Sequence, residues 1–188
     1  MKQIENWKDV NKNEVVEFSN LEAGPQIVKI LKVVDVVEKE YLKIAFDVST
    51  GEFKDCFRDQ FNRDDREDKK WPNSGIMYKS YKASASRFFA AFTTSVEKSN
   101  AGYKWDWKEQ GLVGLIFVAN FREEEYLYND ELKVSLKCYE PRSTVALQAG
   151  RIKIMEKKVL PRQDNSKPAP KIEEPKGDFD KPVDDLPF

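Results

Sequence analysis

Alternation of apolar and polar residues is the feature that most restricts the fold, because it predicts strands with one buried face. In YLKIAFDVS every second residue from Leu42 to Val48 is apolar, whereas Tyr41 and Lys43 fall on the other face. The preceding stretch, 25–40, is rich in Val and Ile with interleaved charges and predicts a long first strand. After an STG turn, EFKDCFRDQF alternates again and predicts a third strand over 52–61.

One helix and two further strands are expected next. Residues 74–98 repeat apolar side chains at three- and four-residue spacing, with Ser74 as a candidate N-cap. GLVGLIFVANF (111–121) is nearly all apolar, and ELKVSLKCYE (131–140) alternates, with Leu132, Val134, Leu136 and Cys138 expected inward. Five strands with a helix between the third and fourth is the order of the OB-fold, although other small β-barrels and α+β domains share it. We therefore expect a mainly β, five-stranded OB-fold-like barrel.

Composition changes near residue 158. Six of the nine prolines lie at or after Pro161, while only two of the 23 aromatic residues, Phe179 and Phe188, lie there. Such a segment buries too little apolar surface to offset its ordering entropy. We predict an N-terminal extension over 1–20, the OB-fold domain over 21–158 and a disordered acidic tail over 159–188.

Charge and residue usage limit the possible chemistry. The chain has 32 basic and 33 acidic residues, but seven acids face four lysines from residue 164 onward, so an acidic arm follows a slightly basic body. There is no histidine, which excludes Ser-His-Asp and Cys-His catalytic sets and histidine-containing metal sites. Cys56 and Cys138 form no CxxC motif, and no signal peptide or long apolar run is evident, so we expect a cytoplasmic protein with reduced thiols and no membrane association.

Aromatic residues interleaved with Lys and Arg mark the expected second and third strands and the regions around them. Rings stack on unpaired bases and cations follow the phosphates, so this mixture indicates single-stranded nucleic-acid binding. The candidate binding residues are Tyr41, Lys43, Lys54, Phe57, Arg58, Phe61, Arg63, Trp71, Tyr78, Lys79, Tyr81, Lys82, Tyr126, Tyr128, Lys133 and Lys137.

Several of these residues have a second interpretation. Phe57 and Phe61, with Phe53, recur at even spacing and equally suit a core face, whereas Trp71 in a polar loop favours ligand contact. Tyr126 and Tyr128 fit either ligand contact or packing. The acidic loop DDREDKK, or Asp35 with the E-x-K of Glu52 and Lys54, resembles a divalent-metal nuclease pattern, but a solvated mixed-charge loop is the ordinary explanation. We expect no catalytic residues, metal or cofactor.

The extreme C-terminus, DDLPF, resembles the tip of bacterial single-stranded DNA-binding proteins. The resemblance implies that the tip docks on replication, recombination and repair enzymes. An apolar pocket would take the ring, and basic residues would pair the carboxylates. The matched residues are Asp184, Asp185, Leu186, Pro187 and Phe188.

The body has a second resemblance. LEAGPQIVKI, EKEYLKIAFDVSTGEFKD and NAGYKWDWKEQGLVGLIF are similar to replication-module proteins of bacteriophages that infect Firmicutes, over about 21–158. Pro25, Asp55 and the long NRDDREDKK loop depart from that pattern. The resemblance implies a protein that coats single-stranded DNA without sequence specificity in a bacterial host cell, with homo-oligomers possible. A recombination mediator that binds mainly proteins and a metal-dependent nuclease are the alternatives.

Overall fold

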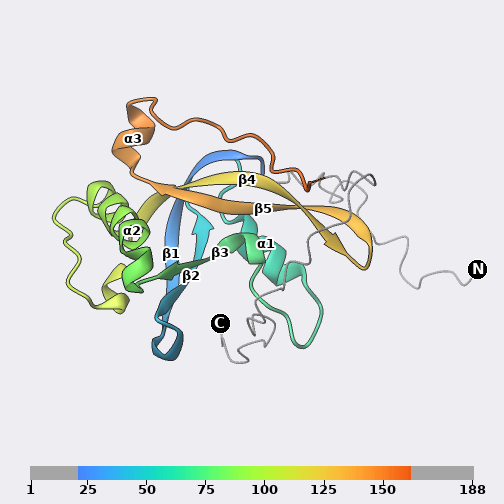
Figure 1. Ribbon diagram of the computed structural model, residues 1–188, viewed down its shortest axis with the longest axis horizontal. Coiled ribbons are helices and arrows are strands. Elements are labelled where there is room, and N and C mark those ends of the chain that lie inside the picture. Colours follow the sequence, from blue (N-terminus) through green and yellow to red (C-terminus); the bar gives the residue numbers. More distant parts are fainter. Residues whose placement is uncertain (1–20, 162–188) are drawn as a thin grey trace, which may run out of the picture.

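Five antiparallel strands form one sheet in the computed structural model, which describes residues 21–161 (Figure 1). Their order across the sheet is β3-β2-β1-β4-β5, so the first strand lies at the centre. This confirms the predicted mainly β, five-stranded class. The strands are β1 (Gly24–Val36), β2 (Tyr41–Val48), β3 (Ile76–Ser80), β4 (Ile116–Tyr128) and β5 (Glu131–Arg142).

The helices lie around this sheet (Figure 1). The longest, α2, connects β3 to β4, as the OB-fold order requires. Two short α-helices that the sequence did not predict stand between β2 and β3 and after β5. The helices are α1 (Cys56–Arg63), α2 (Ser86–Ser99) and α3 (Thr144–Gln148), with 3-10 turns η1 (Val37–Lys39), η2 (Asn73–Gly75), η3 (Ala83–Ala85) and η4 (Glu109–Leu112).

The sheet is open, with β3 and β5 as its two edges, but it curls so that these edges approach each other. Lys79 on β3 lies close enough to Cys138 and Glu140 on β5 for the charges to affect one another. Burial lowers the pKa of Lys79 and raises that of Cys138 to about 12. The strand order and this approach of the two edges resemble the partly open barrel of an OB-fold, although β3 and β5 do not pair.

The first two strands agree with the alternation that predicted them. Leu42, Ile44 and Phe46 of β2 are buried on one face, as expected. β1 ends at Val36 instead of residue 40, because η1 and the left-handed Glu40 (φ 53°) turn the chain into β2.

The predicted third strand over 52–61 is wrong, because this segment contains helix α1. Phe57 and Phe61 are separated by four residues, which places them on one face of a strand or of a helix equally well. In the helix, Phe57 is buried and Phe61 packs partly buried against the core. The core interpretation of these two rings is therefore correct, although the predicted element was not.

A buried aspartate on β2 explains why a helix begins here. Asp47 accepts hydrogen bonds from the backbone N–H groups of Phe57 and Arg58, both at 3.0 Å, at the first turn of α1. Its carboxylate also accepts the Val48 N–H at 2.8 Å. Helix N-termini leave N–H groups without intrahelical partners, and Asp47 supplies those partners from a neighbouring strand.

We expect Asp47→Ala to destabilise the domain, because it leaves buried α1 N–H groups without acceptors. The free energy of unfolding should fall by about 1–3 kcal/mol, measured by urea denaturation. Asp59→Ala, on the exposed surface of the same helix, is the matched control and should change stability little. Equal losses in the two variants would contradict a capping role for Asp47.

The helix predicted over 74–98 is correct only in its second half. Residues 76–80 form β3, where Met77 pairs with Ile44 and Tyr78 with Lys43 of β2. The helix begins at Ser86, so Ser74 is not its N-cap. Met77 is buried and Tyr78 is exposed, the period-two pattern of a strand, which the longer helical period of the following residues concealed.

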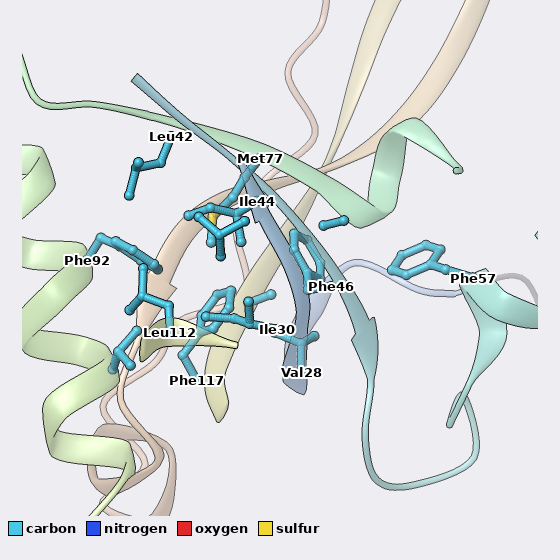
Figure 2. Packing of buried hydrophobic residues seen from close by; sticks show 14 of the residues in the cluster. Val28, Ile30, Leu42, Ile44, Phe46, Phe57, Met77, Phe92, Leu112 and Phe117 are labelled. Carbon is cyan, nitrogen blue, oxygen red and sulfur yellow. The ribbon is translucent and has the colours of Figure 1, made fainter. Parts of the chain in front are cut away.

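The core lies between the inner face of the sheet and helix α2, as Figure 2 shows. Phe46 of β2 is at its centre, with ring centroids 5.8 Å from Phe117, 6.1 Å from Phe57 and 6.3 Å from Phe121. Phe92 of α2 packs edge-on against Phe117 at 5.8 Å. Helix α2 therefore covers the apolar face that the β2 alternation predicted.

The last two strands extend beyond that core as a long hairpin (Figure 1). β4 is buried only as far as Phe121, and on β5 Leu136 and Cys138 pack partly buried against the core. The prediction that Leu132 and Val134 point inward is wrong: both are exposed. The chain then runs back beside β4, where the Lys158 N–H donates to the Glu123 carbonyl at 2.9 Å.

Candidate nucleic-acid interface

Two tyrosines and a lysine meet on the outer face of β2 and β3. Lys43 is the direct cross-strand partner of Tyr78, and Tyr41 lies two residues before Lys43 on the same face. The Tyr41 and Tyr78 rings contact each other edge-on, with centroids 5.5 Å apart. Tyr78 is 58% exposed, so its ring is open to a planar ligand.

Two further lysines complete what we call the β2–β3 face, defined by Tyr41, Lys43, Tyr78, Lys32 and Lys70. Lys32 lies on β1 and Lys70 on the loop after α1. Burial lowers the pKa of Lys43, and the ammonium groups of Lys70 and then Lys32 lower it further. Lys43 is therefore repelled by both neighbouring lysines, and an anion bound beside it would relieve that repulsion.

Three of the predicted aromatic contacts lie in or against the core instead. Trp71 is only 5% exposed; its indole N–H donates to the Phe46 carbonyl at 3.3 Å, and its ring lies 5.7 Å from that of Phe61. Phe57 is buried beside Phe46. The prediction that Trp71 contacts ligand is wrong, because the polar loop folds its ring under α1.

Residues at and after the end of β3 point in different directions. Lys79 faces β5 on the inner side of the sheet. The Tyr81 hydroxyl donates to Asp35 at 2.9 Å and its ring packs against Phe89 at 6.1 Å. Lys82 is exposed beyond the strand. The structure therefore separates Lys79 and Tyr81 from Tyr78, although the sequence grouped them.

The cations around α1 are exposed but lie on a different element. Arg58 pairs with Asp55 across one helical turn at 3.5 Å. Lys54 precedes the helix and Arg63 ends it. These residues form a basic rim on α1. Lys43 has the exposed Tyr78 ring beside it, but no exposed ring within 21–161 lies beside Arg58 in the same way.

Three of the four candidates on the β4–β5 hairpin are exposed and Lys133 is half-buried, and the four form a group of their own. Lys133 Nζ lies 4.6 Å from the centre of the Tyr128 ring and pairs opposite Tyr126 in the hairpin register. Lys137 pairs with Glu124 at 3.5 Å. This hairpin projects away from the body (Figure 1), so it provides a second surface of exposed aromatic rings, separate from the β2–β3 face, on which both lysines pair with glutamates.

A cluster of rings that α2 and the following loop bring together was not predicted from the sequence. Phe89 stacks on Trp107 with a centroid distance of 6.0 Å and an interplanar angle of 19°, and Trp105 meets Phe89 edge-on at 5.8 Å. These rings, with Tyr81, line a pocket of about 170 Å³ that also contains the carboxylates of Asp35 and Glu109. We call this the aromatic pocket. The motif Trp105-Asp-Trp107 in a polar stretch was the sequence feature that could have indicated it.

The nuclease pattern does not assemble. Asp35 accepts from Tyr81, while Glu52 and Lys54 lie in a turn and not on a strand. In the acidic loop, Arg66 Nε donates to Asp64 at 2.8 Å, and this bond holds the pKa of Asp64 down at about 2. Within residues 21–161, no three Cys, Asp or Glu side chains gather as a metal site would require.

The predicted docking tip, 184–188, and the N-terminal extension, 1–20, lie outside the described residues. The described chain includes the first residues of the predicted tail, where the Leu160 N–H donates to Glu125 at 3.3 Å. None of the helices within 21–161 is both long and apolar enough to cross a membrane.

The sequence matches no family model, and none of the curated proteins is significantly similar to it.

Proposed function

We propose that this protein binds single-stranded DNA without sequence specificity, using the β2–β3 face as its primary contact. The observation that carries the proposal is the placement of Tyr78 directly across from Lys43, with Tyr41 against its ring. Stacking is available to every base because each has a π-face, and the adjacent ammonium groups pair with phosphates. This arrangement provides affinity without a base code.

The position of this face within the fold supports the same function. OB-folds bind oligonucleotides across strands 2 and 3 and the loops beside them. Here those strands carry the exposed Tyr78 and the half-buried Tyr41, and Lys70 comes from the loop between them. The basic rim at Arg58 and the hairpin surface at Tyr128 would extend the path of a bound strand in two directions.

The sequence of the tail adds a second role to the proposal. Single-stranded DNA would bind to the folded domain, while the DDLPF terminus would recruit replication, recombination and repair enzymes of a bacteriophage-infected host cell. This part rests on the resemblance of 184–188 alone. Its acidic residues would also compete weakly with phosphates for the basic face.

Salt dependence tests the phosphate contacts. Log affinity for fluorescein-labelled oligo(dT), measured by anisotropy, should fall with log salt at a slope of about −0.7 per contact. Lys43→Gln should flatten the slope by about 0.7. Because Lys43 is repelled by Lys70 and Lys32, removing its charge should leave the domain at least as stable.

Lys104→Gln is the matched control, since Lys104 is an exposed lysine that pairs with Glu97 at 3.5 Å after α2. It should leave the slope unchanged. A slope near zero for the intact protein, or equal flattening in both variants, would overturn the proposed use of the β2–β3 face.

A further inference from the structure

We infer that the aromatic pocket binds the cationic side chain of a lysine or arginine from a partner protein. The pocket is lined by four aromatic rings and two carboxylates: Tyr81, Phe89, Trp105, Trp107, Asp35 and Glu109. This inference concerns a second site, whose chemistry differs from that of the β2–β3 face.

Ring geometry is the first argument. Trp107 and Phe89 stack, and Trp105 lies 6.0 Å from Trp107 at an angle of 55°, so the rings present faces in more than one direction. Aromatic faces carry negative electrostatic potential and attract ammonium and guanidinium groups within about 6 Å. Several tilted rings around one small space form the aromatic cage that recognises such cations.

The charge of the pocket is the second argument. Asp35 and Glu109 add two carboxylates to the aromatic walls. The Tyr81 hydroxyl holds Asp35 in place at 2.9 Å, which fixes one of the carboxylates before a ligand arrives. Carboxylates repel a phosphodiester backbone and attract a cation, so the pocket suits a ligand opposite in charge to DNA.

The fold keeps the two sites apart. Leu42 lines the aromatic pocket, whereas its neighbours Tyr41 and Lys43 belong to the β2–β3 face. Successive residues of a strand point to opposite sides, so β2 separates a basic aromatic surface from an acidic aromatic one. A bound DNA strand on the outer side would therefore leave the pocket accessible.

The size and exposure of the pocket fit a single side chain. Its volume, about 170 Å³, is below the range of about 300–1,000 Å³ that is usual for whole small-molecule ligands. Trp107 is 73% exposed, and its backbone has a φ of 65°, a left-handed conformation that is sterically costly for a residue with a bulky side chain. Such strained residues cluster at binding sites, where the surrounding structure holds them in position.

Ligand-observed saturation-transfer NMR on the full chain tests the inference with three sets of probes. Nα-acetyl-lysine methylamide and Nα-acetyl-arginine methylamide should bind, and the uncharged Nα-acetyl-norleucine methylamide should bind at least about three-fold more weakly, because it has an apolar stem without the cation. Choline should bind better than its neutral isostere 3,3-dimethylbutanol. Deoxycytidine and thymidine, as free nucleosides, should show no saturation transfer that the Trp107→Ala substitution removes.

Matched variants locate the site. Trp107→Ala should weaken binding of the lysine probe about 3- to 30-fold. Glu109→Lys should weaken it at least about ten-fold, because the new ammonium group would occupy the pocket and repel the cationic probe. Asp106→Lys makes the same charge change one residue before Trp107, at a carboxylate outside the pocket lining, and should change the affinity less than about two-fold.

Three results would overturn the inference: equal binding of the lysine and norleucine probes, equal effects of Glu109→Lys and Asp106→Lys, or nucleoside binding that Trp107→Ala abolishes. Oligo(dT) anisotropy on Glu109→Lys separates this inference from the proposed function. Normal DNA binding with lost lysine binding supports two independent sites. Loss of both would show that the pocket belongs to the DNA interface.

Discussion

Replacing Trp71 with Ala should lower the free energy of unfolding by about 3–5 kcal/mol, the loss typical of a large ring removed from a core. Trp71 is 5% exposed and packs on Phe61, and its N–H bonds the Phe46 carbonyl. Gly75 shows how tightly the ring is enclosed, because a Cβ at that position would lie 2.5 Å from the indole nitrogen. Urea denaturation of the variant and the unmodified chain measures the difference.

DNA affinity distinguishes this role from a stacking role. At a temperature where Trp71→Ala remains folded, its affinity for oligo(dT) should change less than about three-fold, since stacking on a base would contribute about 1–3 kcal/mol. Trp71→Phe keeps part of the packing and should lose less stability than Trp71→Ala. A variant with normal stability and much weaker DNA binding would contradict the buried position.

Strands with one clean buried face were predictable from sequence, and β2 is the clearest example. Leu42, Ile44 and Phe46 alternate with polar residues and occupy the core as expected. The same alternation placed Tyr41 and Lys43 on the outer face, where the structure places them. Local pattern was sufficient here because the first half of the strand has one apolar and one polar side, although Ala45 and Asp47 on the second side are buried too.

Helix α1 was not predictable from local pattern, because the carboxylate that accepts hydrogen bonds from its first turn lies on strand β2. Phe57 and Phe61 suit a strand and a helix alike, and the choice depends on the Asp47 carboxylate, ten residues before Phe57 in the chain. The same limit applies to Trp71. A polar loop suggested exposure, but the loop places its one large ring in the core, against Phe61 of α1.

The candidate interface was predicted in part. Tyr78 is exposed, as a contact residue would be, but the sequence placed it in a helix that begins only at Ser86. Lys32 was missed, because a lysine among valines on a first strand looks like an ordinary solvent-facing residue. Trp107 was missed because stacking on Phe89 depends on how the loop after α2 folds back. Surfaces built from segments that are distant in the sequence can be recognised only once the tertiary structure is known.

Replacing Tyr78 with Ala should weaken oligo(dT) binding by about 1–3 kcal/mol, or roughly 5- to 150-fold in Kd. Tyr78 is 58% exposed, so its loss removes little buried surface and should leave the melting temperature nearly unchanged. Tyr41→Ala should act in the same direction, because its ring supports Tyr78 from the side at 5.5 Å. Anisotropy with labelled oligo(dT) and thermal melting measure the two effects.

Tyr139→Ala is the matched control for Tyr78→Ala. Tyr139 is 51% exposed on β5, and the Arg122 guanidinium already lies over its ring, 3.7 Å from the centroid. Its replacement should leave oligo(dT) affinity unchanged. Tyr78→Phe should also bind normally, because a stacking ring needs its π-face and not its hydroxyl group. If Tyr78→Phe binds as weakly as Tyr78→Ala, the contact is a hydrogen bond from the phenol. If Tyr139→Ala binds as weakly as Tyr78→Ala, DNA does not select the β2–β3 face.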